Sequence, residues 1–221
     1  RTFNKEKAEE IASAVRDQAL EVSSVTSKEK KSFAPGLYDL TTLQREANQR
    51  YGYSAKQTLN IMQRLYENHK VLTYPRTDSR YIGKDIVPTI KERLKACAVG
   101  PYRKLAGALM NQPIHANGSF VDDKKVSDHH AIIPTEQFVQ LDHMTNEDRK
   151  IYDMVVRRFL SVLYPPFIYE QVSMEGKTVG ELFAASGKVV KSVGWKEVYE
   201  NMDTDGSDDD IDSADESQKL K

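Results

Sequence analysis

Cysteine and long apolar runs are scarce in this sequence, and each scarcity excludes a class of structure. The single cysteine, Cys97, excludes an internal disulfide and a zinc site built from cysteines, and it suits a reducing cytoplasm. No run of about 18 apolar residues occurs, so no membrane-spanning helix is predicted. Arg1–Lys5 is no signal peptide and lacks an initiator methionine, and we expect the chain to be a fragment of a longer protein.

The composition is otherwise that of a soluble globular protein, with 39% hydrophobic and 29% charged residues in 221. The net charge of −1 hides an uneven distribution, because residues 203–216 hold eight of the 33 acidic side chains and no basic one. The rest of the chain has 32 basic against 25 acidic side chains. This mildly basic remainder fits a polyanionic partner, although many proteins without such a partner are as basic.

The acidic end of the chain is poor in apolar residues, and we expect residues 203–221 to be a disordered linker. Asp203–Gly206 resembles the start of a calcium loop, but the glycine and glutamate positions of an EF-hand are absent. Asp210 and Asp212 resemble a magnesium-binding pair, but no apolar strand leads into them. We therefore predict a solvated linker, and no metal site in this chain.

Apolar spacing and capping residues predict a mainly helical middle of the chain, over residues 37–164. Capping boxes are predicted at Thr41–Gln44 and Ser54–Gln57. The helix that begins at Ser54 carries an apolar stripe typical of plain core, made by Leu59, Met62, Leu65 and Tyr66. The expected helices span residues 4–20, 41–52, 54–68, 84–98, 101–111 and 145–163.

The flanks of this middle part are richer in extended structure. Residues 20–27 look extended, and so does the short segment 71–74 inside the helical part. After Pro165-Pro166, three antiparallel strands are predicted, with turns at residues 175–177 and at Gly187; they span 168–174, 178–186 and 188–193. The fold class expected from this pattern is α+β.

Tyr74 has the most informative surroundings, because Pro75 follows it and Arg76, Asp78 and Arg80 lie close by. A residue before proline avoids the helical region, so Tyr74 is predicted to end a strand or lie in a turn. A phenol with a pKa of about 10 is a weak nucleophile, and cationic groups on a phosphate would help it attack. In extended backbone, Arg76 and Asp78 share the face of Tyr74. The alternative is a half-buried core tyrosine beside surface ion pairs.

His129 and His130 precede an apolar run, Ala131–Ile133, where a histidine is commonly just a core residue. Metal binding is disfavoured, because adjacent histidines point in different directions and no third ligand is near in the sequence. By themselves the two histidines do not show whether they belong to the core or to a functional site.

Three segments together resemble the type IA DNA topoisomerases, and in particular the topoisomerase III branch. They are residues 37–48 with 54–59, residues 72–81 and residues 127–135, in the order and spacing of that family. The resemblance covers most of residues 1–200. It implies that Tyr74 is the active-site tyrosine, that Arg76 is the phosphate clamp and that His129 contacts the scissile phosphate. It also implies DNA contacts by Gln63, Arg64, Thr73, Asp78, Arg80 and His130.

In that family, a mainly helical domain with the catalytic tyrosine is inserted into a β-rich hinge domain. The resemblance assigns residues 37–164 to the inserted domain, and 1–36 and 165–202 to the hinge. It implies cleavage of one DNA strand through a 5′-phosphotyrosine, strand passage and religation, with single-stranded and negatively supercoiled DNA as substrates. The bacterial cytoplasm, in association with the nucleoid, is the implied location.

The family also uses Mg²⁺, held by a Toprim domain with an Asp-x-Asp-x-Glu cluster. Nothing in this sequence matches that domain. We therefore expect the chain to need the remaining domains of the same polypeptide, and not to relax DNA by itself.

Three other interpretations compete with this one. A tyrosine recombinase or type IB topoisomerase also uses a tyrosine, but on or near a helix, which Pro75 disfavours. A non-catalytic module for single-stranded DNA would use Tyr74 to stack on a base. A plain structural domain would have no affinity for nucleic acid.

Overall fold

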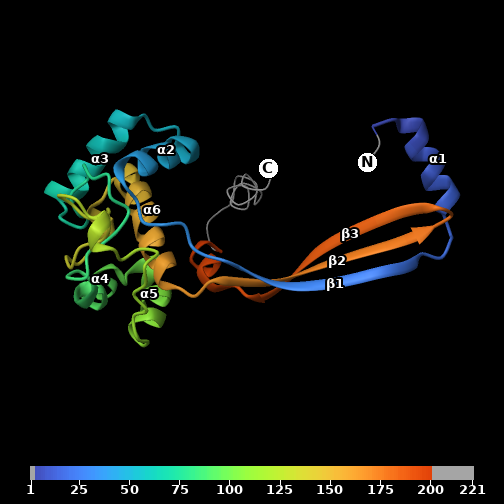
Figure 1. Cartoon of the computed structure of the whole chain (residues 1–221). Helices are drawn as coiled ribbons and strands as arrows, with labels where there is room; N and C mark the ends of the chain where they lie inside the picture. Colours follow the sequence, from blue (N-terminus) through green and yellow to red (C-terminus); the bar gives the residue numbers. More distant parts are fainter. Residues whose placement is uncertain (1–2, 201–221) are drawn as a thin grey trace.

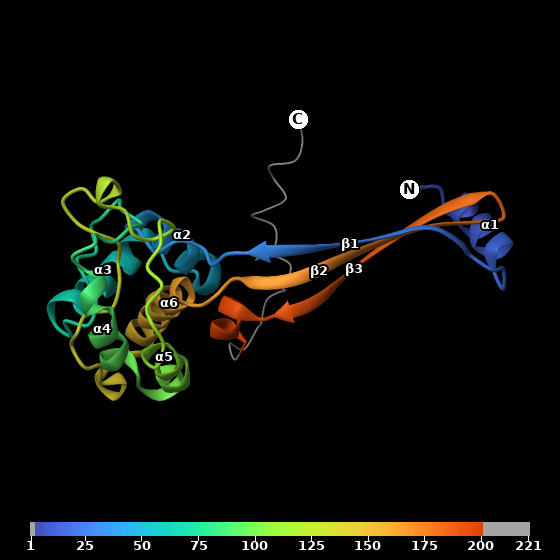
Figure 2. The same cartoon turned by 60° about the horizontal axis from the view of Figure 1, so that its bottom comes forward.

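The computed structural model describes residues 3–200, which form a helical body and a long β-arm (Figure 1 and Figure 2). The helices of the body are α2 (Leu40–Tyr51), α3 (Ala55–Glu67), α4 (Ile90–Cys97), α5 (Arg103–Met110) and α6 (Asn146–Leu163). The arm consists of β1 (Glu21–Ser32), β2 (Phe167–Thr178) and β3 (Glu181–Ser192), with α1 (Lys5–Val15) at its far end. Short 3-10 helices are η1 (Val87–Thr89), η2 (Gly100–Tyr102), η3 (Asp123–Lys125), η4 (Leu141–His143) and η5 (Gly194–Tyr199).

Helix α6 forms the centre of the core of the body. Most of its residues between Asp148 and Val162 are buried, and it packs against α3, α5 and η5. Thr145 caps it, since the Thr145 hydroxyl accepts from the Asp148 N–H at 3.1 Å and the Asp148 carboxylate accepts from the Thr145 N–H at 3.2 Å. The long helix predicted from this residue is confirmed.

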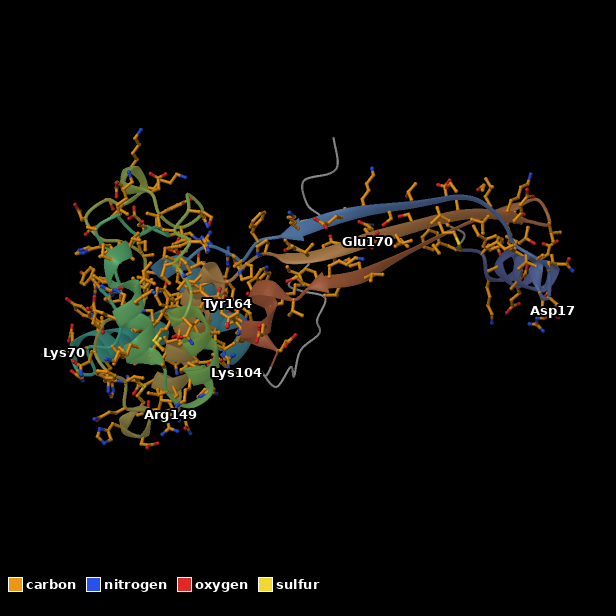
Figure 3. All side chains as sticks on the ribbon, turned by 90° about the horizontal axis from the view of Figure 1, so that it is seen from below. Asp17, Lys70, Lys104, Arg149, Tyr164 and Glu170 are labelled. Carbon is orange, nitrogen blue, oxygen red and sulfur yellow. The ribbon has the colours of Figure 1, made fainter. Side chains whose placement is uncertain are left out.

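The arm joins chain segments from before and after the body. Strand β1 pairs with β2 in antiparallel register, from Ser32 opposite Phe167 to Glu21 opposite Lys177, and β2 pairs with β3 in the order β1-β2-β3. Every residue of β3 except Ser192 is exposed, so among the described residues this sheet has no covering layer. Figure 3 shows side chains leaving both faces of the arm, whereas they crowd together in the body. The chain thus mixes helices with a small antiparallel sheet, as the α+β prediction requires.

The predicted division of the second flank into three strands is wrong. It contains two strands of 12 residues, joined by one two-residue turn at Val179 and Gly180. Their φ angles, 49° and 85°, are both positive, as the tight hairpin turn of type I′ requires. Gly176, expected in a turn, lies within β2, where a Cβ would come within 2.9 Å of the Leu20 side chain. Gly187 lies within β3, opposite Val172.

Several predicted helix ends are also wrong. Helix α1 stops at Val15 rather than at residue 20. Helix α2 begins at Leu40, because the carboxylate of Asp39 accepts from the Thr42 N–H at 2.6 Å and takes the place of the Thr41–Gln44 box. The helix predicted over 84–98 begins only at Ile90. The Ser54 cap of α3 and the end of α2 at Gly52, which has a φ of 69°, are confirmed.

Within residues 3–200, no helix has the length and apolar character needed to cross a membrane. The predicted linker, residues 203–221, lies outside the described residues.

Candidate active site

The segment that carries Tyr74 is extended and forms hydrogen bonds with residues 131–135. The Thr73 N–H donates to the Ile133 carbonyl at 3.0 Å, and the Thr135 N–H donates to the Val71 carbonyl at 3.0 Å. The Thr73 hydroxyl donates to the Ala131 carbonyl at 3.1 Å and accepts from the Ile133 N–H at 3.0 Å. Tyr74 follows this pairing directly, outside any helix, as the proline after it predicts.

A buried arginine fixes the second of these segments to the body. Arg93 of α4 donates to the Pro134 carbonyl at 2.7 Å and forms an ion pair with Glu136 at 2.7 Å. Burial lowers the pKa of Arg93 from its ordinary value, and the charge of Glu136 opposes that shift. The tyrosine segment is thus backed by hydrogen bonds that reach a helix of the core.

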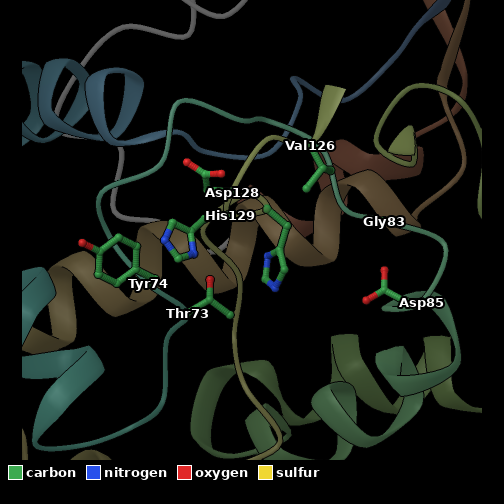
Figure 4. Close-up of a pocket in the computed structure, with 8 residues that line it drawn as sticks. Thr73, Tyr74, Gly83, Asp85, Val126, Asp128 and His129 are labelled. Carbon is green, nitrogen blue, oxygen red and sulfur yellow. The ribbon is translucent and has the colours of Figure 1, made fainter. Parts of the chain in front are cut away.

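The Tyr74 ring lies between two other rings. The His129 imidazole is 4.2 Å away between centroids and tilted by 38°, and the Tyr66 ring stands edge-on at 5.6 Å. Figure 4 shows the imidazole between Tyr74 and Asp128, with the phenol oxygen turned away from the imidazole in this view. The hydroxyl of Thr77 donates to the His129 carbonyl at 3.0 Å and so ties the two segments together. Tyr74 and His129, both singled out in the sequence, are in contact.

Tyr74 separates two hollows. The smaller, a cavity of about 220 Å³, is lined by Thr73, Tyr74, Gly83, Asp85, Val126, Asp128, His129 and His130 (Figure 4). The larger, an open groove of about 620 Å³, is lined by Tyr66, Glu67, Lys70, Leu72, Thr73, Tyr74, His130 and Thr135. Both have charged side chains in their walls, which suits a polar, charged ligand better than an apolar one.

His130 lies at the wall between the two hollows and is half-buried. Its Nδ1 donates to the Ala131 carbonyl at 2.8 Å, so the neutral ring keeps Nε2 as an acceptor. Burial lowers the pKa of His130 from its ordinary value, although this hydrogen bond acts in the opposite direction. Burial thus favours the neutral form of the His130 ring.

Arg76 and Asp78 lie on the solvent side of the same segment. Exposure alternates from Arg76 to Ser79, with Thr77 and Ser79 buried, so Arg76 and Asp78 share one face as predicted. The Ser127 hydroxyl donates to the Asp78 carboxylate at 3.1 Å. Arg76 is exposed and lines neither hollow.

Two of the arginines predicted to bind DNA form hydrogen bonds with other residues of the body. The Arg64 guanidinium donates to the Asp148 carboxylate at 2.7 and 3.1 Å and joins α3 to the start of α6. Burial raises the pKa of Asp148, but hydrogen bonds from Thr145 and Arg64 outweigh it and leave the value below normal. Arg80 donates to the Leu37 carbonyl at 3.1 Å. The side chain of Gln63, half-buried on α3, makes no hydrogen bond to another residue within 3–200.

All of residues 1–221 match the family model described as DNA topoisomerase. This chain belongs to the DNA topoisomerase family. Over 211 residues it is 60% identical to DNA topoisomerase 3 of Bacillus cereus (strain ATCC 10987 / NRS 248), a match that covers 95% of this chain and 29% of the relative. DNA topoisomerase 3 of Bacillus subtilis (strain 168) is 46% identical over 210 residues, with coverages of 95% and 29%.

A solved topoisomerase is similar in three dimensions as well. Full-length topoisomerase I from Thermotoga maritima matches with a TM-score of 0.64 at 25% identity, over 94% of this chain and 33% of that one. The chain therefore spans about 29% of the length of the curated relatives it matches. The predicted resemblance to type IA topoisomerases of the topoisomerase III branch is confirmed.

The sequence alone missed several residues of this candidate site. Tyr66, expected in the core, is 39% exposed and contacts Tyr74. Asp85 and Asp128 line the cavity, and Lys70 lines the groove. The signal that the sequence did offer for Tyr66 was its place at the edge of the apolar stripe, one residue before the end of α3.

A buried polar cluster at the junction of body and arm was also missed. Arg158 of α6 donates to both oxygens of Glu46 at 2.9 and 2.8 Å, to the Tyr38 hydroxyl at 3.0 Å and to the Gly36 carbonyl at 3.1 Å. Burial raises the pKa of Tyr38 well above its ordinary value, although the charge of Arg158 lowers it. Tyr38 in turn pairs with Ile132, next to the histidine segment. The cluster thus connects the start of the arm to the site.

Proposed function

We propose that this chain carries the DNA-cleaving tyrosine of a type IA, topoisomerase III-like enzyme, and that Tyr74 is the nucleophile. The observation that carries the proposal is the contact between Tyr74 and His129 at the boundary of two hollows, in a chain of this family. A half-buried phenol beside an imidazole, with an exposed arginine two residues further along the chain, offers the groups that attack on a phosphodiester needs.

In the proposed step, the Tyr74 oxygen attacks the scissile phosphorus, and the bond from phosphorus to the 3′-oxygen breaks. The phenol loses its proton and the leaving 3′-oxygen gains one, so the reaction balances and leaves a 5′-phosphotyrosine. Attack by the same 3′-hydroxyl reverses the step after strand passage. Arg76 and His129 contact the phosphate oxygens, and the Arg76 charge stabilises them as they gain negative charge.

The other residues implied by the resemblance would contact the bound strand. Thr73 and His130 line the hollows on both sides of Tyr74, and Asp78 lies on the same face as Arg76. Gln63 of α3 is free to bond to DNA. For Arg64 and Arg80, a DNA contact requires release from Asp148 and from the Leu37 carbonyl.

Magnesium, which the resemblance implies, does not fit the residues described. Residues 3–200 contain no group of three or more His, Cys, Asp or Glu side chains able to hold a metal ion. We therefore propose that a Toprim domain elsewhere in the polypeptide holds the ion. We expect that this chain by itself does not relax DNA.

The arm would be part of the hinge, formed by residues 1–36 and 165–202 around the inserted body of residues 37–164. Pairing of β1 with β2 supports this division, because it joins the two flanks of the body. Single-stranded and negatively supercoiled DNA in the bacterial cytoplasm, at the nucleoid, are the proposed substrates and setting.

The test uses the full-length protein that contains this chain, with magnesium and a single-stranded oligonucleotide labelled at one end. Denaturant traps the covalent adduct. Capture of the 3′-end label only, lost in Tyr74→Phe, is the expected result. Capture of the 5′-end label only would indicate recombinase-like chemistry. Tight binding without an adduct, unchanged in Tyr74→Phe, would support a non-catalytic single-strand-binding module.

A further inference from the structure

The groove beside Tyr74 has an aromatic wall that the proposed reaction does not use. Tyr66 is 39% exposed, lines the groove and stands edge-on to the Tyr74 ring at 5.6 Å. A large apolar ring held at the surface beside a nucleophile offers a face on which a nucleobase can stack. Because α3 also contributes buried Ile61, Met62 and Leu65 to the core, the position of Tyr66 is fixed.

Lys70 in the same groove has an unusual backbone conformation. Its φ is 58°, in the left-handed region that favours glycine or asparagine. The surrounding bonds enforce this conformation, because the Val71 N–H donates to the Leu65 carbonyl at 3.0 Å and the Thr135 hydroxyl donates to the Lys70 carbonyl at 2.6 Å. A strained residue of this kind at a functional site suggests that its side chain is needed there.

The charges in the groove match the parts of a nucleotide. The Lys70 side chain is exposed and forms no ion pair with another residue in 3–200, so its ammonium is free for a phosphate. Glu67 is the acidic residue in the wall, and its carboxylate can accept from the amino group of a base. The groove, of about 620 Å³, is open to solvent.

We infer that Tyr66 and Lys70 form a nucleotide subsite in which a base next to the scissile phosphate stacks on Tyr66 and the adjoining phosphate pairs with Lys70. The inference rests on the proposed function, because it takes Tyr74 as the residue that marks the scissile phosphate. It adds two positioning residues that neither the three sequence segments nor the pair of histidines indicated.

Binding of a labelled single-stranded oligonucleotide to the full-length protein with Tyr74→Phe tests the subsite, measured by anisotropy over a range of salt concentrations. Lys70→Gly removes the cation and suits the backbone. We expect an unchanged or higher melting temperature, weaker binding and a salt slope smaller by about 0.7, as for one lost phosphate contact on a single strand. Lys104→Ala, an exposed lysine on another part of the body (Figure 3), is the matched control and should leave the slope unchanged.

Tyr66→Leu should weaken binding by about 5-fold to 100-fold through loss of stacking, while Tyr66→Phe should retain it. If Lys70→Gly changes only the melting temperature, and Tyr66→Leu binds like Tyr66→Phe, the subsite is wrong. The adduct assay with Tyr74 intact separates the two proposals. If the adduct forms but Lys70→Gly and Tyr66→Leu leave DNA binding unchanged, only the subsite is overturned. If no adduct forms, the proposed function and the subsite are overturned together.

Discussion

The body and the arm of this topoisomerase-family chain are stabilised in different ways. In the body, side chains such as Leu65, Phe159 and Leu160 are almost completely buried, and hydrophobic burial supplies the stability. In the arm, Leu182 is 79% exposed and Val190 53%, so among the described residues backbone pairing holds the sheet. The comparison explains where the candidate site lies, because positions of catalytic groups need the rigid support that only the body provides.

The junction between the two parts is built more like the body than like the arm. The Trp195 indole N–H donates to the Ser32 carbonyl at 3.0 Å, and the Trp195 backbone N–H donates to the Pro165 carbonyl at 2.9 Å. Trp195 is buried, and η5 around it packs against α6. These contacts join the end of the arm to α6, the helix that also carries Arg158.

The largest expected difference between body and arm is the loss of stability when an aromatic ring is removed. Phe159→Ala in the core should lower the free energy of unfolding by about 3–5 kcal/mol, through lost burial and the cavity left behind. Phe183→Ala on β3, where the ring is 38% exposed, should cost less than about 1 kcal/mol. Urea denaturation followed by the fluorescence of the single tryptophan, Trp195, measures both. Equal losses would contradict the division into a packed body and an unpacked arm.

A smaller difference in stability is expected when an ion pair is broken at the junction and when one is broken in the arm. Arg158→Met removes the cation that pairs with Glu46 in a mostly buried site and leaves this carboxylate only the Tyr38 hydroxyl, so it should cost about 2–4 kcal/mol. Lys191→Met breaks an exposed pair with Glu170 of 2.8 Å in the arm, and we expect no measurable loss. The same denaturation experiment compares these matched changes from a cation to methionine. A silent Arg158→Met would show that the junction does not depend on this cluster.

The smallest effect concerns the hairpin turn of the arm. Val179→Asn places a residue that tolerates positive φ in the type I′ turn, and should stabilise the hairpin by about 1 kcal/mol. Amide hydrogen exchange should become about 5-fold slower in β2 and β3 near the turn. Val189→Asn, within β3, serves as the control and should not slow exchange. Faster exchange in Val179→Asn would mean that the turn is not strained.

Local signals predicted the parts of the fold whose causes are local. Ser54 and Thr145 cap helices because their hydroxyls meet an N–H three residues on, and Pro75 keeps Tyr74 out of a helix. The turn at Val179 was missed because valine rarely adopts positive φ, so the sequence lacks the usual Asn-Gly or Asp-Gly signal.

The site was predictable only in part, because several of its contacts join residues far apart in sequence. Tyr74 and His129 were found through their segments, yet nothing local says that their rings touch. Arg64 pairs with Asp148, and Arg80 with the Leu37 carbonyl, and each pair joins residues far apart in the chain, so the sequence could not show that these cations are already engaged. Tyr66 was assigned to the core because an apolar stripe does not reveal which of its edges is left uncovered.

The measurement that tests the central claim most directly is the identity of the residue joined to DNA. The covalent adduct of the full-length protein would be trapped with denaturant, digested with nuclease and protease, and analysed by mass spectrometry. The account predicts a peptide containing Tyr74 with a 5′-phosphonucleotide on its side-chain oxygen. The same modification on another residue, or on a Tyr74→Phe variant, would contradict it.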